Sequence, residues 1–396
     1  MNNTAIFTIS SKNYFSFSKT FLESVRKYHP EVDLHFLLAD EAEDLSIFIN
    51  KEIYELSSVK DIGIPEIEKM AFIYDIVEFN TAVKPFFIEY LFKKGYQKVI
   101  YLDPDILVVN RLDAAIEKLD IHSIVVTPHQ LTPVKNIECS VPFLEWEQGA
   151  IQSGIFNLGF IGIANTPEGR SFIAWWSNRC KYLCFIEPQT GLVVDQKWVN
   201  IASCFFSTFH ILRHEGYNVA IWNLHERTVM NNYVNGEKPL VFFHFSSFDF
   251  DAPDIISKHD RQMKLSDRPG LVELFKTYRQ KLKNNGFDHF RSLPYAYDYF
   301  HDGDKIELIE RRLYTFISAF YHNPFQIPSK EFRRTLKKIR RLHTCGPSVR
   351  KRSYVSRCAE KMLTTLYVLI GAKQYTKIVK SLSGIDCMRK HSWLIE

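Results

Sequence analysis

The chain has 396 residues, of which 46% are apolar and 24% are charged, and its formal net charge is +5. A chain of this length can form one large domain with an appendage, or two domains. The composition is that of an ordinary globular protein, and we find neither a low-complexity tract nor the repeat of a solenoid. Disorder and repeat architectures are therefore not expected.

The sequence also bears on cellular location. The first residues lack a basic leader followed by an apolar core, and the apolar stretch 362–370 is far shorter than the ~20 residues that span a bilayer. The seven cysteines are scattered, and only Cys180 and Cys184 lie close together. We therefore expect a cytoplasmic protein with reduced thiols rather than a secreted or zinc-binding protein.

Apolar runs alternate with amphipathic segments along most of the chain. The pattern predicts a helix that begins near residue 12 and ends before Pro30, a short one near Pro65, and one with Thr81 as its cap and Gly95 just past its end. It also predicts helices at 169–184 and 192–202, and strands at 4–10, 33–41, 99–102, 123–128, 155–163 and 240–249. This alternation favours an α/β fold with a mainly parallel central sheet.

The C-terminal part of the chain differs in pattern and charge. Helical patterns occur at 271–283 and 306–320, and strand patterns fade after residue 299. Between 330 and 361 there are twelve Lys or Arg and two Asp or Glu, a charge of +10, which leaves −5 for the remainder. We predict a main domain over 1–298 and a basic helical region over 299–396.

The segment KVIYLDPDILVV places two carboxylates, Asp103 and Asp105, directly after an apolar strand. Two unit charges ~6 Å apart repel by roughly 3 kcal/mol at an effective dielectric constant of ~20, so a cation between them would stabilise the pair. Oxygen ligands suit Mg²⁺ or Mn²⁺. Asp-Pro-Asp is also good turn chemistry, so a purely structural turn is the alternative.

Several segments together resemble a known family. KVIYLDPDILVV, IFNLGFIGI, VVDQKWVN, GYNVAIWNLHER and FFHFSSFD occur in the order found in bacterial GT-A fold glycosyltransferases related to glycosyltransferase family 8. The resemblance spans most of residues 4–265 and implies a Rossmann-like domain that binds a nucleotide-sugar. It further implies that Asp103 and Asp105 hold a divalent cation, Mn²⁺ or Mg²⁺, on the diphosphate, and that His244 completes the metal site.

The same resemblance implies further site residues. Lys84 and Lys258 would lie near the donor phosphates, and Asp195 and Gln196 would approach the reacting carbon of the sugar. The residues implied to line the nucleoside and the donor sugar are Thr8, Ser10, Ser11, Asn13, Asp40, Asn157 and Gly159. Ordinary roles remain open for several: Lys84 as a solvated lysine, and Asp40 and Asp195 as capping residues.

The reaction and the acceptor are less defined. In a retaining enzyme the leaving phosphate can take the acceptor's proton, whereas an inverting enzyme needs a carboxylate base. The retaining outcome is our expectation, although Glu145, Glu147 and Asp195 are available as bases. Sugar-binding side chains on the acceptor side could come from Trp146, Trp222, Asn223, His225 and Glu226.

The basic region raises the question of partners. In EFRRTLKKIRRLH, Phe332, Leu336, Ile339 and Leu342 recur at helical spacing among basic residues. This pattern is typical of an amphipathic helix that lies on an anionic membrane, and equally of one that packs on its own domain. Two other functions remain as alternatives. One is a metal-dependent phosphoryl or nucleotidyl transferase. The other is a nucleic-acid-binding protein, but this function would not explain why the motifs above occur in that order.

Overall fold

The computed structural model describes residues 3–134, 141–315, 318, 321, 323–343 and 354–382. The chain forms two compact units, one of Met1–Pro65 with Ile76–Ala296 and the other of Glu66–Asp75 with Tyr297–Glu396. The second unit thus includes a short segment from the middle of the first. The domain boundary expected at 298/299 does not anticipate this segment and stays a prediction.

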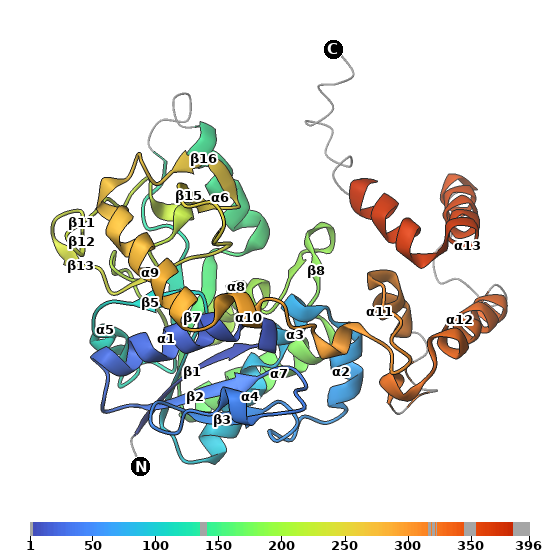
Figure 1. Ribbon diagram of the computed structural model, residues 1–396, viewed down its shortest axis with the longest axis horizontal. Coiled ribbons are helices and arrows are strands. Elements are labelled where there is room, and N and C mark those ends of the chain that lie inside the picture. Colours follow the sequence, from blue (N-terminus) through green and yellow to red (C-terminus); the bar gives the residue numbers. More distant parts are fainter. Residues whose placement is uncertain are drawn as a thin grey trace. The chain divides into compact units, whose positions relative to one another are not determined.

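A seven-stranded sheet forms the centre of the first unit (Figure 1). The strand order is β10-β6-β7-β4-β1-β2-β3, and β7 runs antiparallel to both of its neighbours. The other pairs in the sheet are parallel. The strands are β1 (Thr4–Ser10), β2 (Asp33–Leu38), β3 (Glu55–Ser58), β4 (Lys98–Leu102), β6 (Ile124–Pro128), β7 (Phe156–Ala164) and β10 (Phe209–Ile211). The predicted α/β fold with a mainly parallel sheet is confirmed.

Helices cover both faces of this sheet (Figure 1). On one face lies α1 (Phe15–Tyr28), and on the other lie α4 (Lys84–Lys93) and α7 (Pro167–Tyr182). The remaining helices of the unit are α3 (Ile76–Ala82), α5 (Asp113–Lys118), α6 (Val141–Ser153), α8 (Gln196–Phe205), α9 (Val272–Asn284) and α10 (Phe287–Phe290). Shorter strands are β5 (Ile106–Val108), β8 (Ile186–Glu187), β9 (Leu192–Val193), β11 (Val229–Met230), β12 (Tyr233–Val234), β13 (Lys238–Pro239), β14 (Phe242–His244), β15 (Ile255–Ser257) and β16 (Asp260–Lys264).

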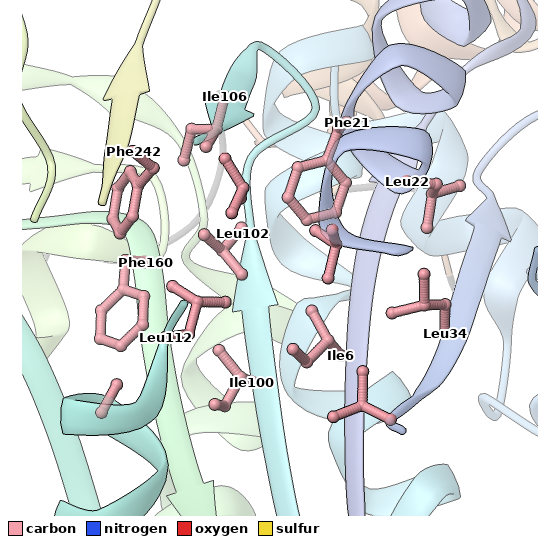
Figure 2. Close-up of a cluster of buried hydrophobic side chains, with 14 of the residues drawn as sticks. Ile6, Phe21, Leu22, Leu34, Ile100, Leu102, Ile106, Leu112, Phe160 and Phe242 are labelled. Carbon is pink, nitrogen blue, oxygen red and sulfur yellow. The ribbon is translucent and has the colours of Figure 1, made fainter. Parts of the chain in front are cut away.

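Side chains that alternate along the central strands build the two sides of the core. Ile6 of β1 and Ile100 and Leu102 of β4 face α1, where they join Phe21 in one buried cluster (Figure 2). Their neighbours in sequence face α4. There the rings of Phe7 and Phe87 lie 5.1 Å apart, and so do those of Phe7 and Tyr101. This alternation directs Tyr101 toward the N-terminus of α4, where the candidate site lies.

Four expectations about element boundaries need correction. Thr81 is no cap, because it lies inside α3 and its hydroxyl donates to the carbonyl of Val77. The helix expected at 192–202 begins only at Gln196, since Val194 adopts a left-handed conformation (φ 42°) that ends β9. The strand expected at 240–249 is limited to Phe242–His244, and the strand expected at 33–41 ends at Leu38. Of the helix expected at 306–320, α11 covers Leu308–Tyr314, and part of the rest lies outside the described residues.

The second unit is helical. It contains α2 (Ile67–Ile73), α11 (Leu308–Tyr314), α12 (Ser329–His343) and α13 (Tyr354–Leu382), which is kinked at Gly371. The guanidinium of buried Arg311 donates to the carbonyls of Ala71, Phe72 and Tyr74 and to the carboxylate of Asp298. Arg311 therefore joins the segment 66–75 to the C-terminal part of the chain. None of the described helices combines the length and apolar composition needed to cross a bilayer.

Candidate active site

The two aspartates follow β4 in a tight turn. The amide of Asp103 donates to the carbonyl of Gly159, and the amide of Ile106 donates back to the carbonyl of Asp103 at 3.2 Å. The segment after β4 is therefore a turn. The turn itself brings the carboxylates together, so the structural and the metal-binding interpretations describe the same local structure.

His244 meets these carboxylates because β14 pairs with β5, the strand after the turn. The register places His244 opposite Ile106, and the amide of Phe245 donates to the carbonyl of Asp105. The Nε2 atom of His244 lies 3.2 Å from Asp105 Oδ1 and 3.6 Å from Asp103 Oδ2. The structure thus brings the three predicted metal ligands together over about 140 residues of sequence.

The chemistry of this cluster fits a divalent cation. One ligand atom from each of the three residues lies within 4.8 Å of the others, and no other such group of His, Cys, Asp or Glu occurs among the described residues. Burial, with the nearby charge of Asp105, raises the pKa of Asp103, although Lys84 and His244 oppose this. Burial lowers the pKa of His244, but Asp105 and Asp103 outweigh it and the net shift is upward. An added cation would relieve the repulsion between the carboxylates.

Lys84 and Asp195 form a buried ion pair beside the cluster. Lys84 Nζ lies 2.7 Å from Asp195 Oδ2 and donates to the carbonyl of Leu158, and both side chains are about 2% exposed or less. Although Asp195 precedes α8, its side chain makes no capping bond, and Lys84 is not solvated. The ordinary roles that the sequence left open for these two residues are therefore not the ones observed.

Tyr101 connects the ion pair to the acidic turn. The Lys84 ammonium lies 4.1 Å from the centre of the Tyr101 ring, and the Tyr101 hydroxyl donates to Asp103 at 2.6 Å. Burial raises the pKa of Asp195. The charge of Lys84 opposes this increase, and the charge of Asp103 adds to it. The charges of the ion pair and of the carboxylate–histidine cluster therefore influence one another directly.

Gln196, Asn157 and Gly159 lie beside this group of charged side chains, but their polar groups form hydrogen bonds within the protein. The amide of Gln196 accepts from the backbone of Leu158 and donates to the carbonyl of Ser153. Asn157 Oδ1 accepts from the Gly159 amide at 3.1 Å. A Cβ on Gly159 would lie 2.5 Å from the His244 ring, so only glycine leaves room for the histidine.

The residues expected to receive the nucleoside cluster at the end of β1. Ser11 donates to Asn13 at 2.6 Å, and the Ser10 hydroxyl accepts from Ser18. The Thr8 hydroxyl is buried and has no partner among the described residues. Tyr14 follows directly, and its pKa is raised by burial and then by the charges of Asp105 and Asp103, so this loop lies near the acidic turn.

Asp40 lies just beyond β2 and is engaged by the backbone. Its carboxylate accepts from the amides of Lys12, Glu41 and Ala296. Burial nevertheless raises its pKa to about 6. Asp40 therefore joins three segments of the first unit, and a contact with a nucleoside would be an additional role.

Lys258 and the acceptor-side candidates are placed less centrally. Lys258 is about half exposed, 4.0 Å from Asp249. Glu226 accepts from the amides of Leu131 and Thr132, and Glu147 accepts from the amide of Val134. Both carboxylates therefore fix the backbone of the loop at 131–134. The side chain of Glu145 lies outside the described residues.

The aromatic and amide candidates on the acceptor side differ in burial. Trp222 is buried against the rings of His129 and His244, Asn223 donates to the carbonyls of His129 and Asn218, and Trp146 and His225 are half-buried. Trp222 thus packs against His244, and Asn223 holds the backbone of His129 and Asn218 beside it.

Three residues of the site were not singled out by the sequence: Tyr101, His129 and Asn218. Tyr101 reads as part of an apolar strand and His129 as part of a polar loop. Asn218 lies within GYNVAIWNLHER, but nothing in that segment indicates its left-handed backbone (φ 54°) or its contact with His244. Their positions depend on contacts between segments far apart in the sequence.

The mainly parallel sheet, with an Asp-x-Asp turn and a histidine at the strand ends, is the arrangement that the resemblance to GT-A enzymes predicts. No protein-family model matches the chain. In sequence, the chain is similar to Bacillus subtilis YfnD, described as an uncharacterized protein, with 24% identity over 250 residues, 61% of this chain and 76% of YfnD.

In structure, it is similar to the galactosyltransferase LgtC in complex with donor and acceptor sugar analogues, with a TM-score of 0.43, 17% identity, and coverage of 70% of this chain and 95% of LgtC. It is also similar to the glycosyltransferase GlyE of Streptococcus pneumoniae TIGR4, with a TM-score of 0.41, 16% identity, and coverage of 75% of this chain and 67% of GlyE. Both of these solved proteins are glycosyltransferases by their descriptions.

Proposed function

We propose that the protein is a metal-dependent glycosyltransferase that moves a sugar from a nucleotide-sugar, in our view a UDP-sugar, to a saccharide or lipid-linked acceptor. The biological role that we propose is assembly of a surface polysaccharide or glycoconjugate. The observation that carries the proposal is the convergence of Asp103, Asp105 and His244 at the end of a central strand. In open α/β sheets this edge is where ligands bind.

Asp103, Asp105 and His244 would hold Mn²⁺ or Mg²⁺, and the bound cation would stabilise the negative charge that develops on the leaving diphosphate. Lys84 adds a fixed positive charge, which Asp195 orients through the buried ion pair. The Tyr101 hydroxyl holds one oxygen of Asp103 and leaves the other facing His244.

Retention of configuration is the stereochemical outcome that we propose. Two of the carboxylates considered as bases are engaged by the protein: Asp195 is paired with Lys84, and Glu147 is bound to a backbone amide. These partners favour a mechanism in which the leaving phosphate accepts the proton of the acceptor.

A donor screen tests this function. Purified protein with Mn²⁺ is incubated with a panel of nucleotide-sugars, and slow release of nucleoside diphosphate is recorded. We expect turnover with one donor class, loss of turnover in Asp105→Asn, and normal turnover in Asp120→Asn, which alters an exposed carboxylate paired with Lys98. Absence of both hydrolysis and Mn²⁺-dependent donor binding would overturn the proposal, and release of pyrophosphate from a nucleoside triphosphate would favour a nucleotidyl transferase.

We also propose that the basic region places the enzyme on an anionic membrane surface. In the second unit Phe332 is fully buried and Arg333 pairs with Glu310 and Asp304, so this side of α12 packs on its own unit. Lys330 and Arg334 are exposed. Residues 344–353 and the side chains of 337–343 and 354–361, which carry most of the charge, lie outside the description.

Vesicle flotation tests the membrane proposal. With vesicles that contain phosphatidylglycerol, we expect the wild type to float and the double variant Lys330→Glu, Arg334→Glu to float less. The control is the double variant Lys276→Glu, Lys283→Glu, which changes two exposed lysines of α9 by the same total charge. Equal flotation of the wild type, the double variant and a chain without residues 330–396 would contradict it.

A further inference from the structure

Asn218 lies directly behind the histidine of the metal cluster. It is fully buried, and its backbone is left-handed, with φ 54°. The next residue, Val219, accepts the amide hydrogen of His244 at 2.8 Å. The Asn218 amide group is thereby placed against the His244 ring, with its Oδ1 3.1 Å from Nδ1.

The orientation of this amide follows from a chain of hydrogen bonds that starts at the backbone. The Gly159 amide can only donate, so the Asn157 atom that it meets at 3.1 Å must be the oxygen. The Asn218 atom 2.9 Å from this oxygen must then be the nitrogen, which also donates to Thr127 Oγ1. The remaining atom of the Asn218 amide, the one that faces His244, is therefore an acceptor.

The hydrogen bond at the other end of this series, between Asn157 and His129, agrees with the same direction. Asn157 Nδ2 lies 3.3 Å from His129 Nε2, which can accept a hydrogen only if the His129 ring is neutral. Burial lowers the pKa of His129 to about 4, which keeps the ring neutral near pH 7. The neutral ring can accept this hydrogen in the tautomer with hydrogen on Nδ1, so the His129 end is compatible with the direction that the Gly159 amide sets.

We infer that Asn218 is a positioning residue that selects the His244 tautomer with hydrogen on Nδ1 and leaves the Nε2 lone pair free for a cation that Asp103 and Asp105 would also bind. The inference rests on the proposed function, since it assigns that lone pair to the divalent cation. A histidine binds a metal only through an unprotonated nitrogen, and the partner of its other nitrogen sets which one is free. Asn218 supplies this partner, and Gly159 supplies the space for the ring.

The left-handed backbone allows a clean test. Asn218→Gly keeps the backbone conformation and removes the acceptor, whereas Asn218→Asp keeps an acceptor oxygen. We expect Asn218→Gly to weaken Mn²⁺ binding by about 10- to 100-fold, measured by electron paramagnetic resonance titration, and Asn218→Asp to restore part of it, because Asp keeps the acceptor toward His244 but loses the donor toward Asn157 and Thr127. The control is Asn235→Gly, because Asn235 has the same φ of 54° but binds Thr228 and Glu215 at a remote turn.

A second measurement reads the tautomer with a diamagnetic cation bound. With ¹⁵N-labelled histidine, saturating Mg²⁺ and His244→Gln for assignment, we expect the ring shifts of His244 to show hydrogen on Nδ1 in the wild type and a mixture of tautomers in Asn218→Gly. Mn²⁺ affinity of Asn218→Gly within about twofold of wild type, or hydrogen on Nε2 in the Mg²⁺-bound wild type, overturns the inference. If the wild type binds neither cation, the proposed function fails; if it binds Mn²⁺ and Asn218→Gly binds it equally well, only the inference fails.

Discussion

The imidazole of His244 lies against Gly159 so closely that a Cβ at this glycine would be 2.5 Å from its Cε1 and 2.7 Å from its Nδ1. Both residues are buried, and the ring is also held by Asn218 and Trp222. The position of the histidine beside the acidic turn therefore depends on the absence of a side chain in the middle of β7.

We predict that Gly159→Ala displaces His244 and lowers Mn²⁺ affinity by about tenfold or more, while the sheet still forms. The matched control is Gly162→Ala in the same strand, whose new Cβ would meet only the flexible end of Leu119 at 3.0 Å. Isothermal titration with Mn²⁺ and circular dichroism of both variants measure the two effects. Equal Mn²⁺ affinity in the two variants would show that the ring can move without cost to the site.

The buried pair of Lys84 and Asp195 gives a prediction for stability. Removal of one partner leaves the other charge buried and unpaired, so we expect Lys84→Met and Asp195→Leu each to lower the free energy of unfolding by about 3–5 kcal/mol. The double variant replaces both charges with apolar groups and should lose less than the sum of the two single losses. Urea denaturation of the four proteins completes the cycle, and additive losses would contradict a direct interaction.

The raised pKa of Asp40 predicts a dependence of stability on pH. Burial raises this pKa from its usual 3.8 to about 6 in the folded protein, so between these values the unfolded chain releases the proton first. The contribution of Asp40 is complete below pH 4 and is lost as the pH rises to 6, by about 3 kcal/mol at most. Asp40→Asn carries no charge, so its free energy of unfolding minus that of the wild type should rise over this range. A pH-independent difference would contradict the assignment.

The hydrogen bonds of Arg311 give a prediction for the stability of the second unit. Its guanidinium donates to Ala71, Phe72, Tyr74 and Tyr297 carbonyls and to Asp298, and Lys at this position could not reach so many acceptors. We expect Arg311→Lys and Arg311→Met to destabilise this unit by about 3 kcal/mol or more. Hydrogen exchange at residues 67–74 should accelerate in both variants. The control is Arg291→Met in the first unit, whose exposed side chain pairs with Asp251 and should leave this exchange unchanged.

The sequence by itself determined the α/β class and the residue types of the site. Period-two and helical patterns are local properties, so the central strands, the helix before β4 and the basic helix α12 were predictable. The acidic pair and His244 were recognisable through the order of the motifs. Boundaries were wrong where a single backbone conformation decides them, as at Val194 with its φ of 42°.

Only the tertiary structure decided how these residues act together. The turn after β4, the pairing of β5 with β14 and the small size of Gly159 bring His244 to the carboxylates, and none of these contacts is local in sequence. Likewise Asn218, Tyr101 and the Lys84–Asp195 pair acquire their roles from partners on other strands and helices. Patterns in a sequence report which face of an element is buried, whereas the geometry of a polar site depends on which elements meet.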